Sequence, residues 1–253
     1  MRIAAVTGSA SGIGAAVRRR LERDGLRVVG VDLRGAEVVA DLATTAGRAA
    51  AVAGVLAASG ARLDALVACA GLGPHVERWP TIVAVNHFGA TSVLAGLRDA
   101  LAKGERPAAV AIASNSATLP YADGPLAAAC LAGDEAEASR LALASDGHTA
   151  YAGSKLALAR WVRREAPAWA RAGIRLNAVA PGPVRTPLLE AGLAHPLYGP
   201  AIRDFPVPTG GPGSPDDVAA AVAFLLGPEA AFCAGSVLFV DGGTDAMLRA
   251  DRF

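Results

Sequence analysis

A tyrosine and a lysine lie four positions apart in the stretch HTAYAGSKLALAR, as Tyr151 and Lys155. Residues with this spacing share one face of an α-helix, with about 5–6 Å between their Cβ atoms. A phenol titrates near pH 10, too high for an efficient base at neutral pH, and a neighbouring ammonium lowers that pKa. The pair therefore indicates a proton-transferring tyrosine, although an exposed lysine beside a half-buried tyrosine would explain the pair taken alone.

Lysine is rare in this chain, because only two of its 24 Lys and Arg residues are lysines. A lysine ammonium is compact and has three rotatable donors, so it can bind ribose hydroxyls where a planar Arg fork would not fit. We therefore expect Lys155 to be a position at which substitution matters.

A glycine-rich segment, TGSASGIG, follows the first strand-like run. It places Gly8, Gly12 and Gly14 where a chain must turn tightly, approach a pyrophosphate and open a helix. Backbone N–H groups at such a helix start bind phosphate oxygens, and Ser11 and Ile13 belong to the same loop. A plain strand-to-helix turn would also explain the glycines alone.

The second strand-like run ends at Asp32, where a carboxylate can accept hydrogen bonds from the adenosine ribose. The same carboxylate would repel the 2′-phosphate of NADP, so NAD is the predicted cofactor and NADP the less favoured one. Arg34 is the opposing feature, and we expect it to face solvent. We also predict that Asp41 and Leu42 contact the adenine and that Cys69, Ala70 and Gly71 contact the adenosine ribose. An ordinary loop would explain each of these two segments equally well.

Short runs rich in Val and Ile alternate with longer runs rich in Ala, Arg and Leu, which is typical of successive βαβ units. We predict one α/β domain over residues 1–253, with a doubly wound, mostly parallel seven-stranded sheet of the Rossmann type. The predicted strands are 3–7, 27–32, 37–40, 63–69, 108–113, 174–180 and 236–240. The predicted helices are 12–24, 44–59, 81–102, 151–171 and 215–226.

Two segments interrupt this alternation. Residues 117–147 contain two short helical patterns, which predict a helical insertion before the tyrosine helix. Residues 183–213 are rich in Pro and Gly yet keep large apolar side chains, which is more typical of a substrate lid than of a passive connection.

Composition excludes several classes of function. The net charge is +1 and no long basic cluster occurs, so a nucleic-acid partner is not expected. No apolar run approaches the roughly 20 residues of a membrane span, and no export signal is visible. The three cysteines form no CxxC pair and the histidines show no metal-ligand spacing, so we expect a cytoplasmic protein without a metal site.

The ordered motifs TGSASGIG, CAG, VNHFG, the serine of VAIAS, YAGSK and NAVAPGPVRTP resemble those of the classical short-chain dehydrogenase/reductase family. The resemblance covers essentially the whole chain. Within that family the segments VGVDLRGAEVVADL, CAGLGP, TPLLEAGL and DGGTDAMLR are similar to bacterial 3α-hydroxysteroid dehydrogenase/carbonyl reductases.

The resemblance implies a role for each chemical residue. Tyr151 would be the general acid in ketone reduction and the base in alcohol oxidation, with Lys155 holding the nicotinamide ribose and lowering the tyrosine pKa. Ser114 would hydrogen-bond the substrate oxygen, and Ser116 is its local rival. Asn86 in VNHFG would hold a water in a proton relay, a role compatible with a buried Asn that satisfies helix backbone.

Thr186, by the same resemblance, would contact the nicotinamide carboxamide, with Val184 supporting it through its backbone. The usual NNAG motif reads ACAG here, so a bracing Asn is missing. The family resemblance also implies that an insertion at 117–147 obstructs the usual tetramer surface. A homodimer, formed hypothetically through 117–147, is therefore the predicted partner state.

The activity implied is hydride transfer between NAD and a bulky apolar secondary alcohol or ketone, a 3α-hydroxysteroid or xenobiotic carbonyl being the first candidates. An aryl or allylic alcohol, such as a coniferyl-alcohol-like compound, stays open as a second substrate class. A non-catalytic NAD-sensing module is the alternative of another class. It predicts a damaged Ser, Tyr or Lys site, whereas all three residues are present.

Overall fold

The computed structural model describes residues 1–252. Its parallel sheet has seven strands in the order β3-β2-β1-β4-β5-β6-β7. The strands are β1 (Ile3–Thr7), β2 (Arg27–Asp32), β3 (Val38–Val39), β4 (Ala65–Ala68), β5 (Ala108–Ile112), β6 (Arg175–Pro181) and β7 (Val237–Val240). The predicted doubly wound α/β fold is confirmed, and the sheet is entirely rather than mostly parallel.

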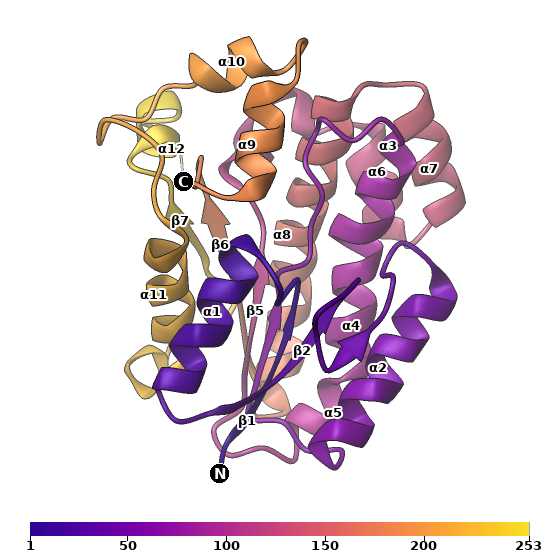
Figure 1. The fold of residues 1–253 in the computed structure, drawn as a ribbon, viewed down its shortest axis with the longest axis vertical. Coiled ribbons are helices and arrows are strands. Elements are labelled where there is room, and N and C mark those ends of the chain that lie inside the picture. Colours follow the sequence, from indigo (N-terminus) through magenta and orange to yellow (C-terminus); the bar gives the residue numbers. More distant parts are fainter. Residues whose placement is uncertain (253) are drawn as a thin grey trace.

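Helices cover both faces of the sheet (Figure 1). In the first half of the chain they are α1 (Gly12–Arg23), α2 (Thr45–Ser59), α3 (Trp79–Val83), the π-helix η1 (Ala84–Gly89), α4 (Ala90–Gly96) and α5 (Arg98–Leu101). In the second half they are the short 3₁₀-helices η2 (Asn115–Thr118), η3 (Pro120–Ala122) and η4 (Pro228–Ala230), with α6 (Pro125–Ala132), α7 (Glu135–Leu143), α8 (Gly147–Arg171), α9 (Pro187–Ala194), α10 (Gly199–Arg203), α11 (Pro215–Leu226) and α12 (Thr244–Leu248).

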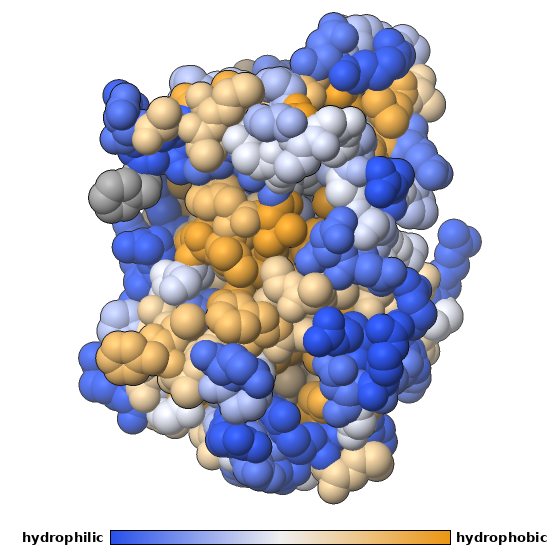
Figure 2. Space-filling model, turned by 90° about the vertical axis from the view of Figure 1, so that its left-hand side faces the viewer, coloured by the Kyte–Doolittle hydropathy of each residue, from blue (hydrophilic) through white to orange (hydrophobic). Residues whose placement is uncertain are grey.

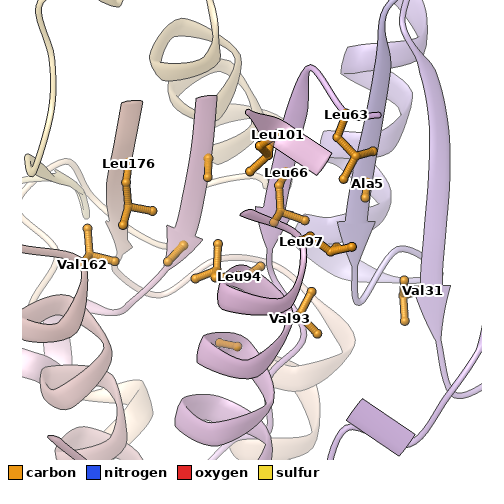
Figure 3. Packing of buried hydrophobic residues seen from close by; sticks show 14 of the residues in the cluster. Ala5, Val31, Leu63, Leu66, Val93, Leu94, Leu97, Leu101, Val162 and Leu176 are labelled. Carbon is orange, nitrogen blue, oxygen red and sulfur yellow. The ribbon is translucent and has the colours of Figure 1, made fainter. Parts of the chain in front are cut away.

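The central strands are short and apolar because helices cover them from both sides. Every residue of β5, with the sequence AAVAI, is buried. One core lies between the sheet and α1 and α11, and the other lies between the sheet and α2, α4, α5 and α8. Figure 3 shows Leu66, Leu97 and Leu101 packed together in the second core. Small alanines in the strands let these helices approach the sheet closely.

The chain leaves β1 in one direction for β2 and β3 and returns to the other side for β4, so β1 and β4 form the switch point of the sheet. Ligand crevices of open α/β sheets lie at the carboxyl ends of the strands at such a point. The glycine loop after β1 and the CAG segment after β4 therefore meet at one edge.

Two predicted helices differ from those observed. The predicted helix 81–102 is divided into α3, η1, α4 and α5, with Asn86 in the π-helical turn. The helix α8, which carries Tyr151 and Lys155, begins at Gly147 rather than at 151, because the Asp146 side chain caps it by accepting a hydrogen bond from the Thr149 amide (2.8 Å). His148 therefore lies in the first turn of α8.

The predicted helical insertion is present as α6 and α7. Gly133 ends α6 in the left-handed region (φ +77°) and the Asp134 side chain caps α7, which explains the break in the pattern. Glu135 of α7 forms an ion pair with Arg48 of α2 (2.6 Å). A buried arginine of α2 thus binds the insertion to the first half of the chain.

No helix in the stretch from residue 1 to residue 252 is long and apolar enough to cross a membrane. The single-domain organisation over 1–253 stays a prediction, and Phe253 lies outside the described residues.

Candidate active site

A cavity of about 430 Å³ opens at the carboxyl ends of the strands. Its walls come from the glycine loop, the segment after β4, the end of β5, the first turns of α8 and the lid. The predicted site residues that line it are Gly8, Ser11, Gly12, Ile13, Gly14, Cys69, Ala70, Gly71, Ser114, Tyr151, Lys155, Val184 and Thr186. Segments far apart in the sequence therefore meet where the motifs predict a single site.

The glycine loop fits a dinucleotide because side chains are excluded at Gly8 and Gly14. Gly8 has φ +68°, and a Cβ there would lie 2.9 Å from the Ala70 backbone. A Cβ on Gly14 would collide with the Gly8 carbonyl. The loop therefore presents bare backbone N–H groups at the start of α1, an arrangement suited to phosphate.

Polar side chains brace this loop. The Asp32 carboxylate accepts hydrogen bonds from the Ala10 amide (2.9 Å) and the Leu33 amide (2.7 Å). The Thr7 hydroxyl accepts hydrogen bonds from the amides of Cys69 and Ala70, each at 3.0 Å. Thr7 therefore supplies a brace beside the ACAG segment, where the sequence left local rigidity in doubt.

Ser114, directly after β5, has a hydroxyl oriented by its neighbour. It accepts hydrogen bonds from the Ser116 amide (3.2 Å) and the Ser116 hydroxyl (3.0 Å). Its own proton stays free for Tyr151 or a substrate oxygen. Ser116 also lines the cavity, but its hydroxyl proton is used on Ser114.

Burial perturbs the pKa values of Tyr151 and Lys155 on α8. It raises the pKa of Tyr151, while the hydrogen bond with Ser114 acts in the opposite direction. It lowers the pKa of Lys155 to about 8, and the ammonium donates to the Ile112 carbonyl at 2.7 Å. Burial thus opposes a lowered Tyr151 pKa, and Lys155 is directed to the end of β5, so the expected lowering of the Tyr151 pKa by Lys155 stays a prediction.

Lys155 should make stability depend on pH. Its folded-state pKa, about 8, lies below the ordinary value of 10.5, so between these values the unfolded chain keeps a proton that the folded protein has lost. Wild-type stability should then rise relative to Lys155→Met by up to about 3 kcal/mol from pH 8 to pH 10.5. Urea unfolding of both proteins at several pH values measures this, and parallel pH profiles would contradict it.

Four predicted residues do not line the cavity. The Asn86 side chain is fully buried and bonds the Leu72 backbone, accepting from its amide (2.8 Å) and donating to its carbonyl (3.0 Å). Asp32, Asp41 and Leu42 lie outside the cavity wall, and the Asp41 carboxylate accepts a hydrogen bond from the Ala43 amide. Their predicted roles toward ribose, adenine and water stay predictions.

The lid is closed at its base. Val184 pairs with Gly213 in an isolated parallel bridge, through hydrogen bonds from the Gly213 amide to Pro183 O (3.0 Å) and from the Arg185 amide to Gly213 O (2.9 Å). Thr186 caps α9, and its methyl group lies 3.3 Å from where a Cβ of Gly12 would be. The base of the lid therefore touches the glycine loop.

The sequence analysis assigned no site role to the residues of the wall beyond Ser114 and Tyr151. It includes the apolar Leu72, Leu119, Leu188, Ile202 and Phe205 and the polar His75, Tyr121 and His148. Only the apolar character of residues 183–213 pointed to part of this wall. His148 carried a findable signal, because it stands three positions before Tyr151 on the same helix face.

The chain is similar to known proteins along its full length. A family model described as Enoyl-(Acyl carrier protein) reductase matches residues 136–245. The 3-alpha-hydroxysteroid dehydrogenase/carbonyl reductase of Comamonas testosteroni is 47% identical over 257 residues, covering 100% of both chains. The cis-4-hydroxycyclohexanecarboxylate dehydrogenase of Sinomonas cyclohexanicum is 33% identical over 97% of each chain.

A solved structure agrees with these relatives. The crystal structure of the 3-alpha-hydroxysteroid dehydrogenase from Pseudomonas sp. B-0831 complexed with NADH has a TM-score of 0.97 and 51% identity, and the match covers 99% of this chain and 100% of that one. The parallel sheet and the cavity thus belong to a Rossmann-type oxidoreductase. The chain is a member of the short-chain dehydrogenase/reductase family, which confirms the family predicted from the motifs.

Proposed function

We propose that the protein is an NAD-dependent dehydrogenase and carbonyl reductase for bulky apolar secondary alcohols and ketones, with 3α-hydroxysteroids as the first substrate class. The observation that carries this proposal is the convergence of Ser114, Tyr151 and Lys155 on one cavity beside a glycine loop whose Gly8 and Gly14 leave no room for a side chain. The names of the relatives from Comamonas testosteroni and Pseudomonas, and the NADH in the latter, support the substrate class and the cofactor.

NAD, when bound, supplies or accepts the hydride. The bare backbone at Gly8 and Gly14 fits its pyrophosphate, and Asp32 at the end of β2 favours a free ribose over a 2′-phosphate. Arg34 is exposed, as expected from the sequence. NADP is therefore the less favoured cofactor.

The side chains move protons only. Ser114 hydrogen-bonds the substrate oxygen, and Tyr151 Oη takes its proton in alcohol oxidation or returns it in ketone reduction. Lys155 holds the nicotinamide ribose, and an ammonium released from Ile112 O to face Tyr151 would favour the phenolate. The apolar wall of Leu119, Ile202 and Phe205 excludes water from the reacting carbon.

The experiment that tests this proposal is steady-state NADH formation from NAD or NADP with three classes of alcohol. Turnover selective for 3α-hydroxysteroids with NAD is the expected result. Turnover confined to coniferyl-type aryl alcohols would keep the chemistry and replace the substrate class. NAD binding without turnover of any class would support an NAD-sensing module instead.

We also propose that the protein is a homodimer. Large exposed apolar side chains are sparse in the predicted interface at 117–147, where only Tyr121 and Leu143 belong to this group within the described residues. They gather instead on the side formed by α11, β7 and α12 (Figure 2). The members of this C-terminal face are Phe224, Phe232, Leu238, Met247 and Leu248.

The C-terminal face includes β7, an edge strand of the sheet, and edge strands usually need cover. A second copy would cover the same surface by two-fold symmetry. This favours the C-terminal face over 117–147 as the interface.

The unpaired cysteines support the proposed cytoplasmic location.

Phe232→Asp should convert the dimer to a monomer, because it places a charge on a side chain that is fully exposed in the isolated chain and would be buried in the dimer. Light scattering measures the mass of wild type and variant. Leu143→Asp, in the insertion, is the matched control and should stay dimeric. Dissociation of the Leu143 variant alone would move the interface back to 117–147, and a stable wild-type tetramer would refute the dimer.

A further inference from the structure

The cavity has two polar regions that differ in how their hydrogen-bonding capacity is used. Beside β5, the Ser114 and Ser116 hydroxyls bond each other, and the Thr186 hydroxyl bonds the Val184 carbonyl and the Leu189 amide. Beyond Tyr151, the cavity wall carries His75, Tyr121 and His148.

His75 lies in the loop after β4, beneath α9. Its ring atoms lie within 3 Å of where a Cβ of Gly73 would be, and Leu188 of α9 packs against the same point. Its Nδ1 is buried without a hydrogen-bond partner among residues 1–252. A lone pair tolerates such a place better than an N–H does, so the ring proton belongs on Nε2.

The His75 Nε2 makes no hydrogen bond with any residue that the structure describes. Unlike Nδ1, it is not among the buried atoms that lack a partner. It is therefore an open N–H donor on a side chain that lines the cavity. Burial and the neighbouring His195 lower the pKa of His75, which keeps the ring neutral at pH 7.

His148 occupies the first turn of α8, three residues before Tyr151, so its Cβ lies about 5–6 Å from the Tyr151 Cβ on the same helix face. Neither of its ring nitrogens bonds a described residue or is buried unpaired. Its ring is held edge-on against Tyr198, with 4.6 Å between centroids. His148 is thus a fixed polar group one turn beyond the reacting tyrosine.

The residues that line this end of the cavity carry no formal charge, and the charge nearest to His148 and Tyr121 is the carboxylate of Asp146, the cap of α8. Lys155 is the only Lys, Arg, Asp or Glu among the residues that line the cavity, and it lies one turn of α8 on the other side of Tyr151. Burial lowers the pKa of His148 as well as that of His75. The far end can therefore hydrogen-bond a neutral oxygen, but it offers no cation to a carboxylate or phosphate.

Resting on the proposed function, we propose that His75 and His148, with Tyr121 beside them, bind a second, uncharged oxygen of the substrate, a hydroxyl or carbonyl remote from the reacting carbon. These residues are specificity-determining rather than catalytic, since they do not touch the reacting atoms. The preferred substrates are then bulky alcohols and ketones with two separated oxygen functions.

The preference for such substrates arises mainly because a substrate without the second oxygen binds at a cost in free energy. An apolar substrate that fills the cavity strips water from the two imidazoles and leaves them unpaired, whereas a second oxygen restores a hydrogen bond. Sites built to bond a polar group reject analogues that lack it for this reason.

The test compares two alcohols that differ in one oxygen, 5α-androstan-3α-ol and its 17-ketone, androsterone. Wild-type kcat/KM should be about ten-fold higher for androsterone, the effect of one or two neutral hydrogen bonds. His75→Leu and His148→Leu should each reduce this ratio to about three-fold or less. His75→Gln, whose amide restores an N–H donor, should retain it, and a steroid with a carboxylate at the same end should be a poorer substrate than androsterone.

Leu119→Ala is the matched control, because it changes the cavity wall without changing its polar groups. It should alter kcat/KM for both alcohols alike. Equal wild-type kcat/KM for the two alcohols, or a ratio unchanged in both leucine variants, would overturn the inference and leave the proposed function standing. Failure to turn over either alcohol, with NAD bound, would overturn the proposed steroid activity and this recognition role together.

Discussion

Tyr151→Phe should reduce kcat for alcohol oxidation by about 10²- to 10⁴-fold, the usual contribution of a positioned acid or base. Tyr151 lines the cavity together with Ser114, so loss of its hydroxyl removes the proposed proton acceptor and little volume. The dissociation constant of NADH, measured by fluorescence titration, should change by less than about two-fold, since the backbone of the glycine loop is untouched.

Tyr198→Phe is the matched control for this experiment. Tyr198 is a buried tyrosine of the lid segment and does not line the cavity, so the same chemical change is made outside the cavity. We expect it to keep most of the wild-type kcat. Near-normal turnover by the Tyr151 variant would refute the assignment of proton transfer to Tyr151.

Arg48→Met should lower the free energy of unfolding by about 3 kcal/mol, or the melting temperature by about 6–12 °C. The Arg48 side chain is buried and donates to Leu42 O (2.8 Å), Ala84 O (3.1 Å) and Glu135 (2.6 Å). Removing it leaves two buried carbonyls and one carboxylate without their donor. Thermal unfolding with and without NAD measures the loss.

Arg18→Met is the control for Arg48→Met. Arg18 also makes a two-point ion pair with a glutamate, Glu37, but its side chain is part-exposed. Partly exposed pairs contribute about 0–1 kcal/mol, so little change is expected. Equal losses in the two variants would show that burial of Arg48 adds nothing to the value of its ion pair.

The succession of strands and helices was predictable because local patterns and the topology rules for βαβ units agree along this chain. The π-helical turn at Asn86 was not, since a single inserted turn leaves the apolar period of 81–102 almost unchanged. The start of α8 was also not predicted. It depends on one N-cap residue, Asp146, and short polar residues of this kind occur in many loops without starting a helix.

The cofactor end of the site was better predicted than the substrate end. Gly8 and Gly14 are required by backbone contacts that no other residue permits, so their spacing is informative. His75 and His148 reach the cavity from a loop and a helix start whose relative placement depends on tertiary packing. No spacing rule connects two such positions.

The bridge between Val184 and Gly213 makes the lid an exchangeable part. The 30-residue excursion begins and ends at one point, so its replacement changes the chain-closure entropy only slightly. Residues that meet the glycine loop, such as Thr186, lie at the base, whereas Leu188, Ile202 and Phe205 lie beyond it. A loop of another length and sequence grafted in place of residues 188–205 would therefore change which substrates fit the cavity. Pro206 and Thr209 would keep their hydrogen bonds with Thr244 and Gly242, and the residues beside the glycine loop would be unchanged.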